Sequence, residues 1–215
     1  METLGNITLY NADCMEIMKG FADKQFDLAI VDPPYGIGEN GGKSRARKKW
    51  NCYDKPLHSI KTWDNFPPTK EYFEHLFRVS KNQIIWGGNY FIDNLHRSEN
   101  IIAWDKQCDK SDFSDFEMAW TSFSKANKIF RLPIQSESQC RIHPTQKPVA
   151  LYKWILKNYA KEGQTILDTH LGSGSSAIAA HDGGFEFTGI ELDEEYYNAA
   201  KERIIMHQRQ LNLFR

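Results

Sequence analysis

The chain has 215 residues, of which 40% are hydrophobic and 26% are charged, and its net charge is −1. These values are typical of one globular domain with a sizeable core, and they exclude disordered and strongly basic classes of protein. We expect no signal peptide and no membrane-spanning helix, because the N-terminus lacks a basic start and the apolar runs fall short of roughly 18–20 residues.

The spacing of the cysteines and histidines limits the kinds of site that we expect. The four cysteines, at positions 14, 52, 108 and 140, are widely spaced and form no C-x-x-C pair. We therefore expect reduced thiols in a cytoplasmic protein. The seven histidines show no metal-ligand spacing, so we predict no metal site.

Short apolar runs alternate with amphipathic stretches along the whole chain. This strand–helix alternation predicts an open α/β sheet, with a basic, Gly-rich loop at 38–62 and a hairpin formed by 116–123 and 125–132. The strand-like runs lie at 7–13, 26–32, 82–88, 100–105, 165–168 and 185–192, and the helix-like stretches at 14–21, 71–80, 147–160, 175–184 and 193–210.

A nucleotide-cofactor pattern occupies the second half. In "TILDTHLGSGSSAIAA" a strand ends at Asp168, and Gly172, Ser173 and Gly174 precede a helix. Glycines let the backbone turn tightly and approach a ligand. Glu191 follows the next strand, where an acidic side chain can accept hydrogen bonds from both ribose hydroxyls of an adenosine-type cofactor. A tight strand–helix turn beside an ordinary acidic residue is the competing interpretation.

The identity of the cofactor depends on Asp168. Dinucleotide sites carry a third glycine, and this chain has Ala177 there, a replacement that some such sites tolerate. A carboxylate before the glycines repels a phosphate and attracts an ammonium or a sulfonium group. S-adenosylmethionine carries both cations and no phosphate, so the pattern favours it.

The sequence "DPPY" follows a buried-looking strand and comprises Asp32, Pro33, Pro34 and Tyr35. The prolines hold the backbone extended and contribute no N–H group, so the turn presents acceptors without competing amide donors. Two acceptors that bind the hydrogens of a nucleobase amine stabilise the charge that develops as its nitrogen attacks a methyl group. An aromatic ring can stack on a base flipped out of its helix. A strand-terminating turn with a core tyrosine is the alternative.

Together these motifs resemble the S-adenosylmethionine-dependent DNA amino-methyltransferases. The order of DPPY before the glycine motif is similar to the circularly permuted β group, and "HPTQKP" (143–148) and "GIELDEEYYNAAKERI" (189–204) resemble further segments of that group. The resemblance implies a single Rossmann-like domain over 1–215, with a seven-stranded, mostly parallel sheet and the N-terminal strand beside the C-terminal half. Short target-recognition segments would lie at about 36–66 and 106–140.

The resemblance also implies the site residues. DPPY would be catalytic, Asp13 would contact adenine, and Thr145 and Lys147 would lie near the methionine end of the cofactor. Where the family usually has Pro-Phe after the glycine-motif Asp, this chain has Thr169-His170. The full predicted cofactor set is Asp13, Cys14, Asp32, Thr145, Lys147, Asp168, His170, Gly172, Ser173, Gly174, Ser175, Glu191 and Leu192.

Contacts with DNA are weakly marked. We predict that Lys43, Arg45, Arg47, Lys48 and Lys49 contact phosphates of double-stranded DNA, although a solvated loop explains them as well. Asn89 and Tyr90 are candidates to line the base pocket. The resemblance leaves open a homodimer and a place in a restriction–modification pair.

Several functions compete at this point. The family tends to use Asp in the tetrapeptide for adenine N6 and Ser for cytosine N4, so Asp32 favours adenine. An NAD-type oxidoreductase would share the fold but leave DPPY unexplained. An inactive DNA-binding relative is disfavoured by the intact tetrapeptide. RNA or a protein amide is a further possible substrate. Relatives that act on protein amides usually carry Asn at the first position of the tetrapeptide, so Asp32 disfavours that option.

Overall fold

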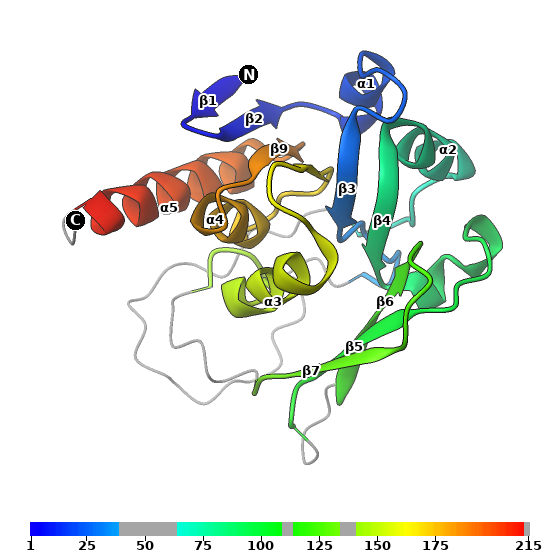
Figure 1. Ribbon diagram of the computed structural model, residues 1–215. Helices are drawn as coiled ribbons and strands as arrows, with labels where there is room; N and C mark the ends of the chain where they lie inside the picture. The colour runs from blue at the N-terminus through cyan, green and yellow to red at the C-terminus, as the bar shows by residue number, and fades with distance from the viewer. Residues whose placement is uncertain (39–63, 109–113, 134–140, 213–215) are drawn as a thin grey trace.

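The computed structural model describes residues 1–38, 64–108, 114–133 and 141–212 (Figure 1). These residues form one nine-stranded sheet in the order β1-β2-β9-β8-β3-β4-β6-β5-β7. The strands are β1 (Glu2–Leu4), β2 (Ile7–Asn11), β3 (Phe26–Val31), β4 (Ser80–Trp86), β5 (Ile101–Asp105), β6 (Phe116–Thr121), β7 (Lys128–Arg131), β8 (Thr165–Asp168) and β9 (Glu186–Glu191).

The sheet is mostly parallel, as predicted, but the implied number of seven strands is wrong. Five neighbouring strands, β2, β9, β8, β3 and β4, are all parallel, and the N-terminal β2 lies beside β9 as expected. Within the described residues, one further strand lies on each outer side of the sheet. β1 pairs with β2 through a tight turn in which Gly5 has φ +64°, and β7 pairs with β5.

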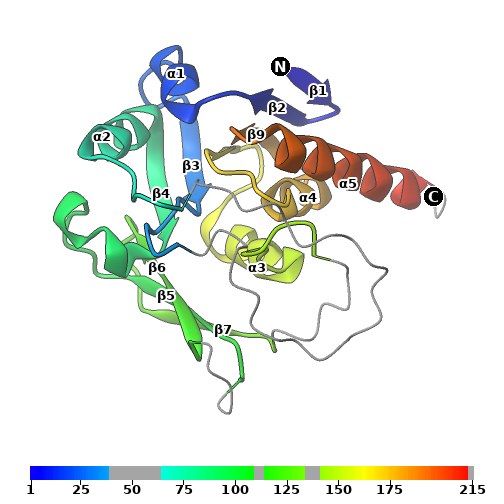
Figure 2. The same ribbon diagram turned by 180° about the vertical axis from the view of Figure 1, so that it is seen from behind.

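Helices cover both faces of the sheet, so the molecule has three layers (Figures 1 and 2). The cause is the alternation along the central strands. Leu28 and Ile30 pack with one set of helices, whereas Ala29 and Val31 pack with the other. The first set is α3 (Val149–Tyr159), α4 (Ser175–Asp182) and α5 (Glu194–Asn212), and the second is α1 (Cys14–Lys19) and α2 (Lys70–Val79).

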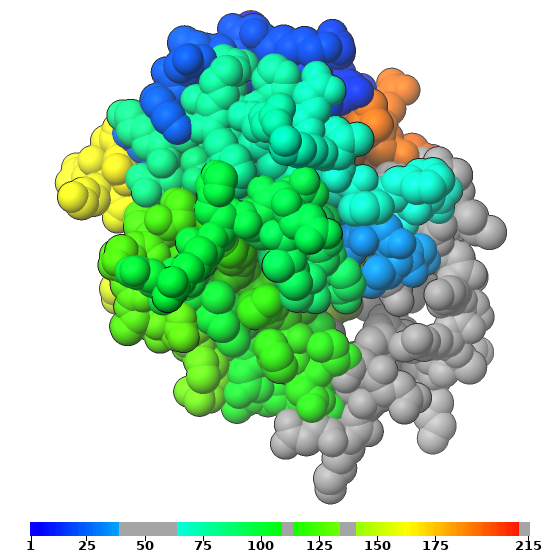
Figure 3. All heavy atoms as spheres, turned by 90° about the vertical axis from the view of Figure 1, so that its right-hand side faces the viewer, coloured from blue at the N-terminus to red at the C-terminus, as the bar shows by residue number. Residues whose placement is uncertain are grey.

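The predicted hairpin of 116–123 with 125–132 is wrong. β6 and β7 both pair with β5, which lies between them. Side-chain hydrogen bonds carry the connecting segment across β5: the Asn127 Oδ1 atom accepts from the Ile101 N–H, and the Asn100 Nδ2 atom donates to the Ala126 carbonyl. In Figure 3, α2 (teal) lies above the green residues of the segment that follows β4 on this side of the molecule.

The strand directions bring several chain segments to one edge of the sheet. β2, β9, β8 and β3 are parallel, so their carboxyl ends share that edge. β6 is antiparallel to β4, and therefore the N-terminal end of β6 reaches the same edge. Among the helices within the described ranges, none has the length and apolar character needed to cross a membrane.

Candidate active site

A cavity of about 200 Å³ opens at this edge of the sheet. Segments that are far apart in the sequence contribute to its wall, because the parallel strands end there together. The lining residues are Ala12, Asp13, Cys14, Asp32, Pro34, His143, Thr145, Gln146, Lys147, Tyr152, Thr169, His170, Leu171, Gly172, Ser173, Glu191, Leu192 and Tyr196.

The glycine loop between β8 and α4 is held by its own hydrogen bonds. The Asp168 carboxylate accepts from the His170 N–H (3.0 Å) and from the Ser176 hydroxyl (2.6 Å). Burial raises the pKa of Asp168 to about 7. Gly174 has φ +73°, a backbone conformation that favours glycine, at the start of α4. Asp168 therefore shapes the loop and does not line the cavity.

Glu191 lies at the end of β9 and is fixed on both oxygens. Its Oε2 atom accepts from the Gly172 N–H (2.8 Å), and its Oε1 atom accepts from the Asp193 N–H (2.9 Å). Burial raises the pKa of this carboxyl above its ordinary value. Each oxygen retains a lone pair, so Glu191 can still accept hydrogen bonds from a ligand in the cavity.

Asp13 and Cys14 enter the cavity at the start of α1. The Asp13 carboxylate caps the helix by accepting from the Met15 N–H (2.8 Å). Burial, reinforced by the Asp13 carboxylate, raises the pKa of the Cys14 thiol to about 12. Cys14 therefore stays a neutral thiol that packs in the wall and does not act as a nucleophile.

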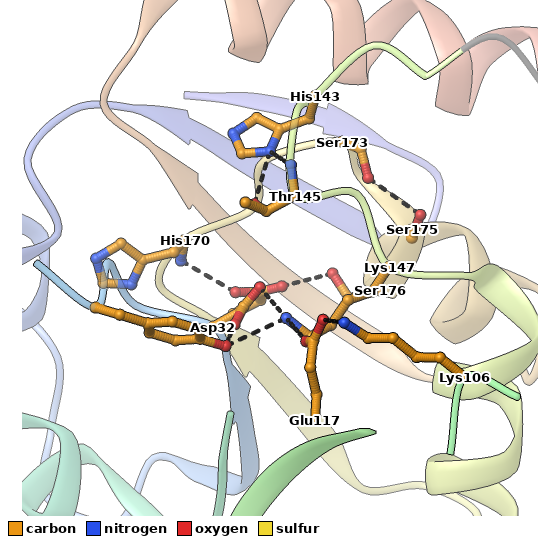
Figure 4. A network of polar contacts seen from close by, with 12 residues as sticks. Asp32, Lys106, Glu117, His143, Thr145, Lys147, His170, Ser173, Ser175 and Ser176 are labelled. Atoms are coloured by element: carbon orange, nitrogen blue, oxygen red, sulfur yellow. Dashed lines mark hydrogen bonds and ion pairs between the residues drawn. The ribbon is translucent and has the colours of Figure 1, made fainter. Parts of the chain in front are cut away.

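Asp32 stands directly after β3 in the wall of the cavity. Its Oδ1 atom accepts from the Tyr35 hydroxyl (2.7 Å), and its Oδ2 atom is 2.5 Å from the Lys147 ammonium (Figure 4). Burial raises the pKa of Asp32, and the ammonium of Lys147 opposes that shift. The proline corner contributes no amide donors, as predicted, but two side-chain donors that the sequence did not reveal bind the carboxylate.

The Tyr35 ring is fixed by close packing. It stacks on Tyr90 with ring centroids 4.8 Å apart and an interplanar angle of 15°. A Cβ atom at Gly87 would lie 2.2 Å from the Tyr35 ring, so a larger residue there would displace the ring. Burial raises the pKa of Tyr35 well above its ordinary value, so its hydroxyl remains a donor to Asp32.

Lys147 connects Asp32 to two residues that sequence reasoning missed. Its ammonium is 3.1 Å from the Glu117 carboxylate, which in turn is 2.6 Å from the Lys106 ammonium. Burial would raise the pKa of Glu117, but the two lysines hold it at about 2. One signal was available in the sequence: Glu117 shares a strand face with Ala119 and Thr121, which are both buried.

Aromatic and hydroxyl side chains complete the wall. Burial lowers the pKa of His170 to about 4, so the ring is neutral, and its Nδ1 atom lies 2.9 Å from the Thr169 hydroxyl. The Tyr72 ring meets His170 edge-on and its hydroxyl is 2.7 Å from that of Thr169. His143 packs edge-on against Tyr196 with ring centroids 4.3 Å apart.

The structure brings most of the predicted set together. Ten of the predicted cofactor residues line the cavity, namely Asp13, Cys14, Asp32, Thr145, Lys147, His170, Gly172, Ser173, Glu191 and Leu192. The other three, Asp168, Gly174 and Ser175, belong to the glycine loop or its ends but do not line the cavity. Of DPPY, Asp32 and Pro34 line the cavity, Pro33 is buried and Tyr35 packs beside it.

Of the predicted DNA contacts, the structure describes Asn89 alone. Asn89 is exposed and does not line the cavity. Lys43, Arg45, Arg47, Lys48 and Lys49 lie outside the described residues, as does most of the predicted recognition segment 36–66. Within the described ranges, no three His, Cys, Asp or Glu side chains gather as a metal site would need.

Comparisons with known proteins agree with this architecture. A family model described as DNA methylase matches residues 63–202, a segment that contains Lys147 and Glu191 but begins after Asp32. The type II methyltransferase M2.DpnII of Streptococcus pneumoniae is 24% identical over 250 residues, which cover 91% of this chain and 88% of the relative.

Two solved structures share the fold. The crystal structure of the M1.HpyAVI–SAM complex has a TM-score of 0.63 at 22% identity and covers 92% of this chain and 98% of its own. The cytosine-N4-specific PvuII DNA methyltransferase has a TM-score of 0.61 at 14% identity and covers 98% of this chain and 94% of its own. At these identities the two structures establish the fold alone.

Proposed function

Because the chain belongs to the DNA methylase family, we propose that it transfers a methyl group from S-adenosylmethionine to the exocyclic N6 amine of an adenine that is flipped out of double-stranded DNA. The observation that carries this proposal is the position of Asp32, a carboxylate in the wall of the cavity that the glycine loop also lines. A reacting amine and a cofactor would meet there.

The cavity suits a cofactor without phosphates. Lys147 is the one lysine or arginine among the described lining residues, and its ammonium is already paired with two carboxylates. In the glycine loop the Gly172 N–H is bound by Glu191, and the Gly174 N–H donates to the Leu171 carbonyl. These groups would serve a pyrophosphate poorly, which disfavours a dinucleotide.

The acceptors in the wall fit an adenosine. The Glu191 carboxylate can accept the ribose hydroxyls, and Asp13 stands beside it at the start of α1 for the adenine. When bound, S-adenosylmethionine supplies an electrophilic methyl group on a sulfonium. The three carboxylates of Asp13, Asp32 and Glu191 outnumber the one ammonium of Lys147 among the lining residues, which suits a cationic cofactor.

Asp32 is proposed to act on the base. Its oxygens each accept from one side chain, Tyr35 or Lys147, so each has a further lone pair for the amine hydrogens. As the nitrogen forms its bond to the methyl carbon, the carbon–sulfur bond would break and leave a neutral thioether. Positive charge then develops on the amine, and the carboxylate stabilises it. The nitrogen then loses a proton, for which Asp32 is the adjacent base.

Base identity and family subgroup are the finer parts of the proposal. Asp at the first position of the tetrapeptide favours adenine over cytosine within the resembling family. Asp32 precedes Gly172 in the chain, the motif order of the β group. We also propose that residues 1–215 form one domain. The named type II relative supports a site-specific modification enzyme in a restriction–modification pair.

The test is to identify the modified base. The purified protein would be incubated with S-adenosylmethionine and unmethylated genomic DNA, and the digested nucleosides would be separated by mass spectrometry. We expect N6-methyladenine. N4-methylcytosine alone would overturn the base assignment, and failure to methylate any base of double-stranded DNA would overturn the proposed function.

A further inference from the structure

Four side chains of alternating charge form a chain that leads away from the cavity. Asp32, Lys147, Glu117 and Lys106 follow one another at 2.5, 3.1 and 2.6 Å (Figure 4). The side chains of Lys147 and Lys106 are only 3% and 9% exposed, and those of Asp32 and Glu117 are 16% and 27% exposed. Each ammonium lies beside a carboxylate, so the buried charges offset one another.

This row of four charged side chains joins two parts of the fold. Asp32 follows β3 of the parallel region, whereas Glu117 is on β6 and Lys106 directly follows β5. In the pairing of β5 with β6, Asp105 lies opposite Phe116, which places Lys106 and Glu117 at the same end of this pair. The outer two charges therefore come from antiparallel strands beyond the glycine motif's half of the sheet.

Glu117 and Lys147 differ in their relation to the cavity. Lys147 lines it, and Glu117 does not. The Lys147 ammonium lies between two carboxylates, 5.3 Å from the Trp86 ring centroid and 5.9 Å from that of Tyr35. Glu117 therefore attracts the Lys147 ammonium away from the cavity, in which a base and a cofactor would bind.

The position of this ammonium matters for a cationic cofactor. A lysine side chain has four rotatable bonds, and without Glu117 its ammonium would keep only the Asp32 carboxylate and the Tyr35 hydroxyl, 3.5 Å away, as partners. It would then have more freedom to turn toward the cavity. There it would repel a sulfonium and cover the Asp32 oxygens needed by the amine. The Glu117 carboxylate behind Lys147 prevents the repulsion and the covering, because two fixed acceptors restrict the ammonium more than a single acceptor would.

We propose that Glu117 is a positioning residue that anchors the Lys147 ammonium against Asp32 and out of the cavity, and that Lys106 holds Glu117 in that place. This inference rests on the proposed function. It assigns to the antiparallel strands a part in methyl transfer although they touch neither the base nor the cofactor.

The first test is Glu117→Gln, which keeps the shape and removes the charge. The matched control is Glu74→Gln, which removes an exposed carboxylate paired with Lys70 on α2. We expect the single-turnover rate of methyl transfer at saturating substrates to fall about tenfold or more in Glu117→Gln and to be unchanged in the control.

A binding readout separates positioning from a general loss of structure. Affinity for S-adenosylmethionine, which carries the sulfonium, is compared with that for S-adenosylhomocysteine, its neutral thioether product. Glu117→Gln should weaken the sulfonium ligand about threefold to tenfold more than the thioether, since a loosened ammonium repels only the charged ligand. Equal weakening of both ligands, or a wild-type transfer rate, would overturn the proposal.

The single variant leaves Lys106 without its carboxylate and is at risk of misfolding, so a charge-balanced variant completes the test. Glu117→Gln combined with Lys106→Met removes one whole ion pair and retains Asp32 with Lys147. We expect it to melt close to the wild type yet show the same slow transfer and the same ligand discrimination. Wild-type transfer by the folded double variant would contradict positioning, whereas an inactive wild-type protein would contradict the proposed function itself.

Discussion

The parallel and antiparallel regions of the sheet contribute to the site in different ways. β2, β9, β8 and β3 lead directly into residues that line the cavity, and short motifs around these strand ends predicted most of them from the sequence. β5 and β6 contribute Lys106 and Glu117, which lie behind the wall and belong to no such motif. Binding chemistry is thus local in sequence, whereas its electrostatic support is assembled by the fold.

The sharpest way to break this comparison is at Asp32. Asp32→Ala should reduce single-turnover methyl transfer by roughly 10²–10³-fold, because the developing charge on the amine loses its acceptor. Cofactor affinity should fall much less, by about tenfold at most, since the adenosine is assigned to Glu191 and Asp13 and the cofactor loses only the charge of Asp32. Isothermal titration and a rapid-quench assay measure the two quantities. A variant that loses only cofactor binding would move Asp32 from the base to the cofactor.

A smaller effect is expected at Glu191, which tests the parallel region's part in cofactor binding. Glu191→Ala should weaken S-adenosylmethionine binding by about 1–3 kcal/mol, the scale of hydrogen bonds to a charged group. Glu186→Ala is the matched control, because Glu186 is exposed at the other end of β9. Unchanged affinity in Glu191→Ala, or equal losses in both variants, would contradict the ribose assignment.

The pH dependence of stability sharpens the account of His170. Desolvation lowers the pKa of this partly buried ring to about 4 from 6.5, so between these values the unfolded chain binds a proton that the folded chain excludes. Stability from a neutral His170 is therefore lost as pH falls through this window. His170→Phe should raise the melting temperature relative to wild type more at pH 5 than at pH 7.5, as differential scanning fluorimetry measures. A difference independent of pH would show that the ring is not buried neutral.

The smallest effect on chemistry is expected from the cations at 43–49. Replacing Lys43, Arg45, Arg47, Lys48 and Lys49 by glutamine should reduce the slope of log affinity against log salt by about 0.9 for each phosphate that the protein then leaves unneutralised. The single-turnover rate at saturating DNA should not change. A control with Lys157→Gln and Lys161→Gln, on and after α3, should keep the wild-type slope. An unchanged slope in the first variant would remove this run from the DNA-binding surface.

The fold was predictable from the sequence in the parallel region of the sheet and less so in the antiparallel region. The helices and the strands of the parallel region were predicted because their hydrophobic periods are regular and their ends carry Asp, Gly or Pro residues. β1 was missed because Glu2–Leu4 is too short to show a period. The hairpin prediction failed because adjacency in sequence was taken for pairing, whereas Asn100 and Asn127 carry the chain across β5.

The site was predictable to the extent that it is encoded locally. DPPY and the cofactor pattern predicted Asp32, Gly172 and Glu191, which line the cavity. Asp168 was predicted to bind the cofactor, but its carboxylate accepts hydrogen bonds within its own loop and at the start of α4. The ion pair of Lys147 with Glu117 joins residues 30 positions apart through the pairing of β6 with β4. No local pattern carries such a pair, because the strand order that creates it is a property of the whole sheet.

A crystal structure with S-adenosylmethionine or an unreactive analogue, together with a DNA duplex containing the target base, tests the central claim most directly. We predict the base amine within hydrogen-bond distance of Asp32, the methyl-bearing end of the cofactor facing that carboxylate, and Lys147 still bound to Glu117. A cofactor whose methyl group faces away from Asp32, or an amine held by other residues, would contradict the account.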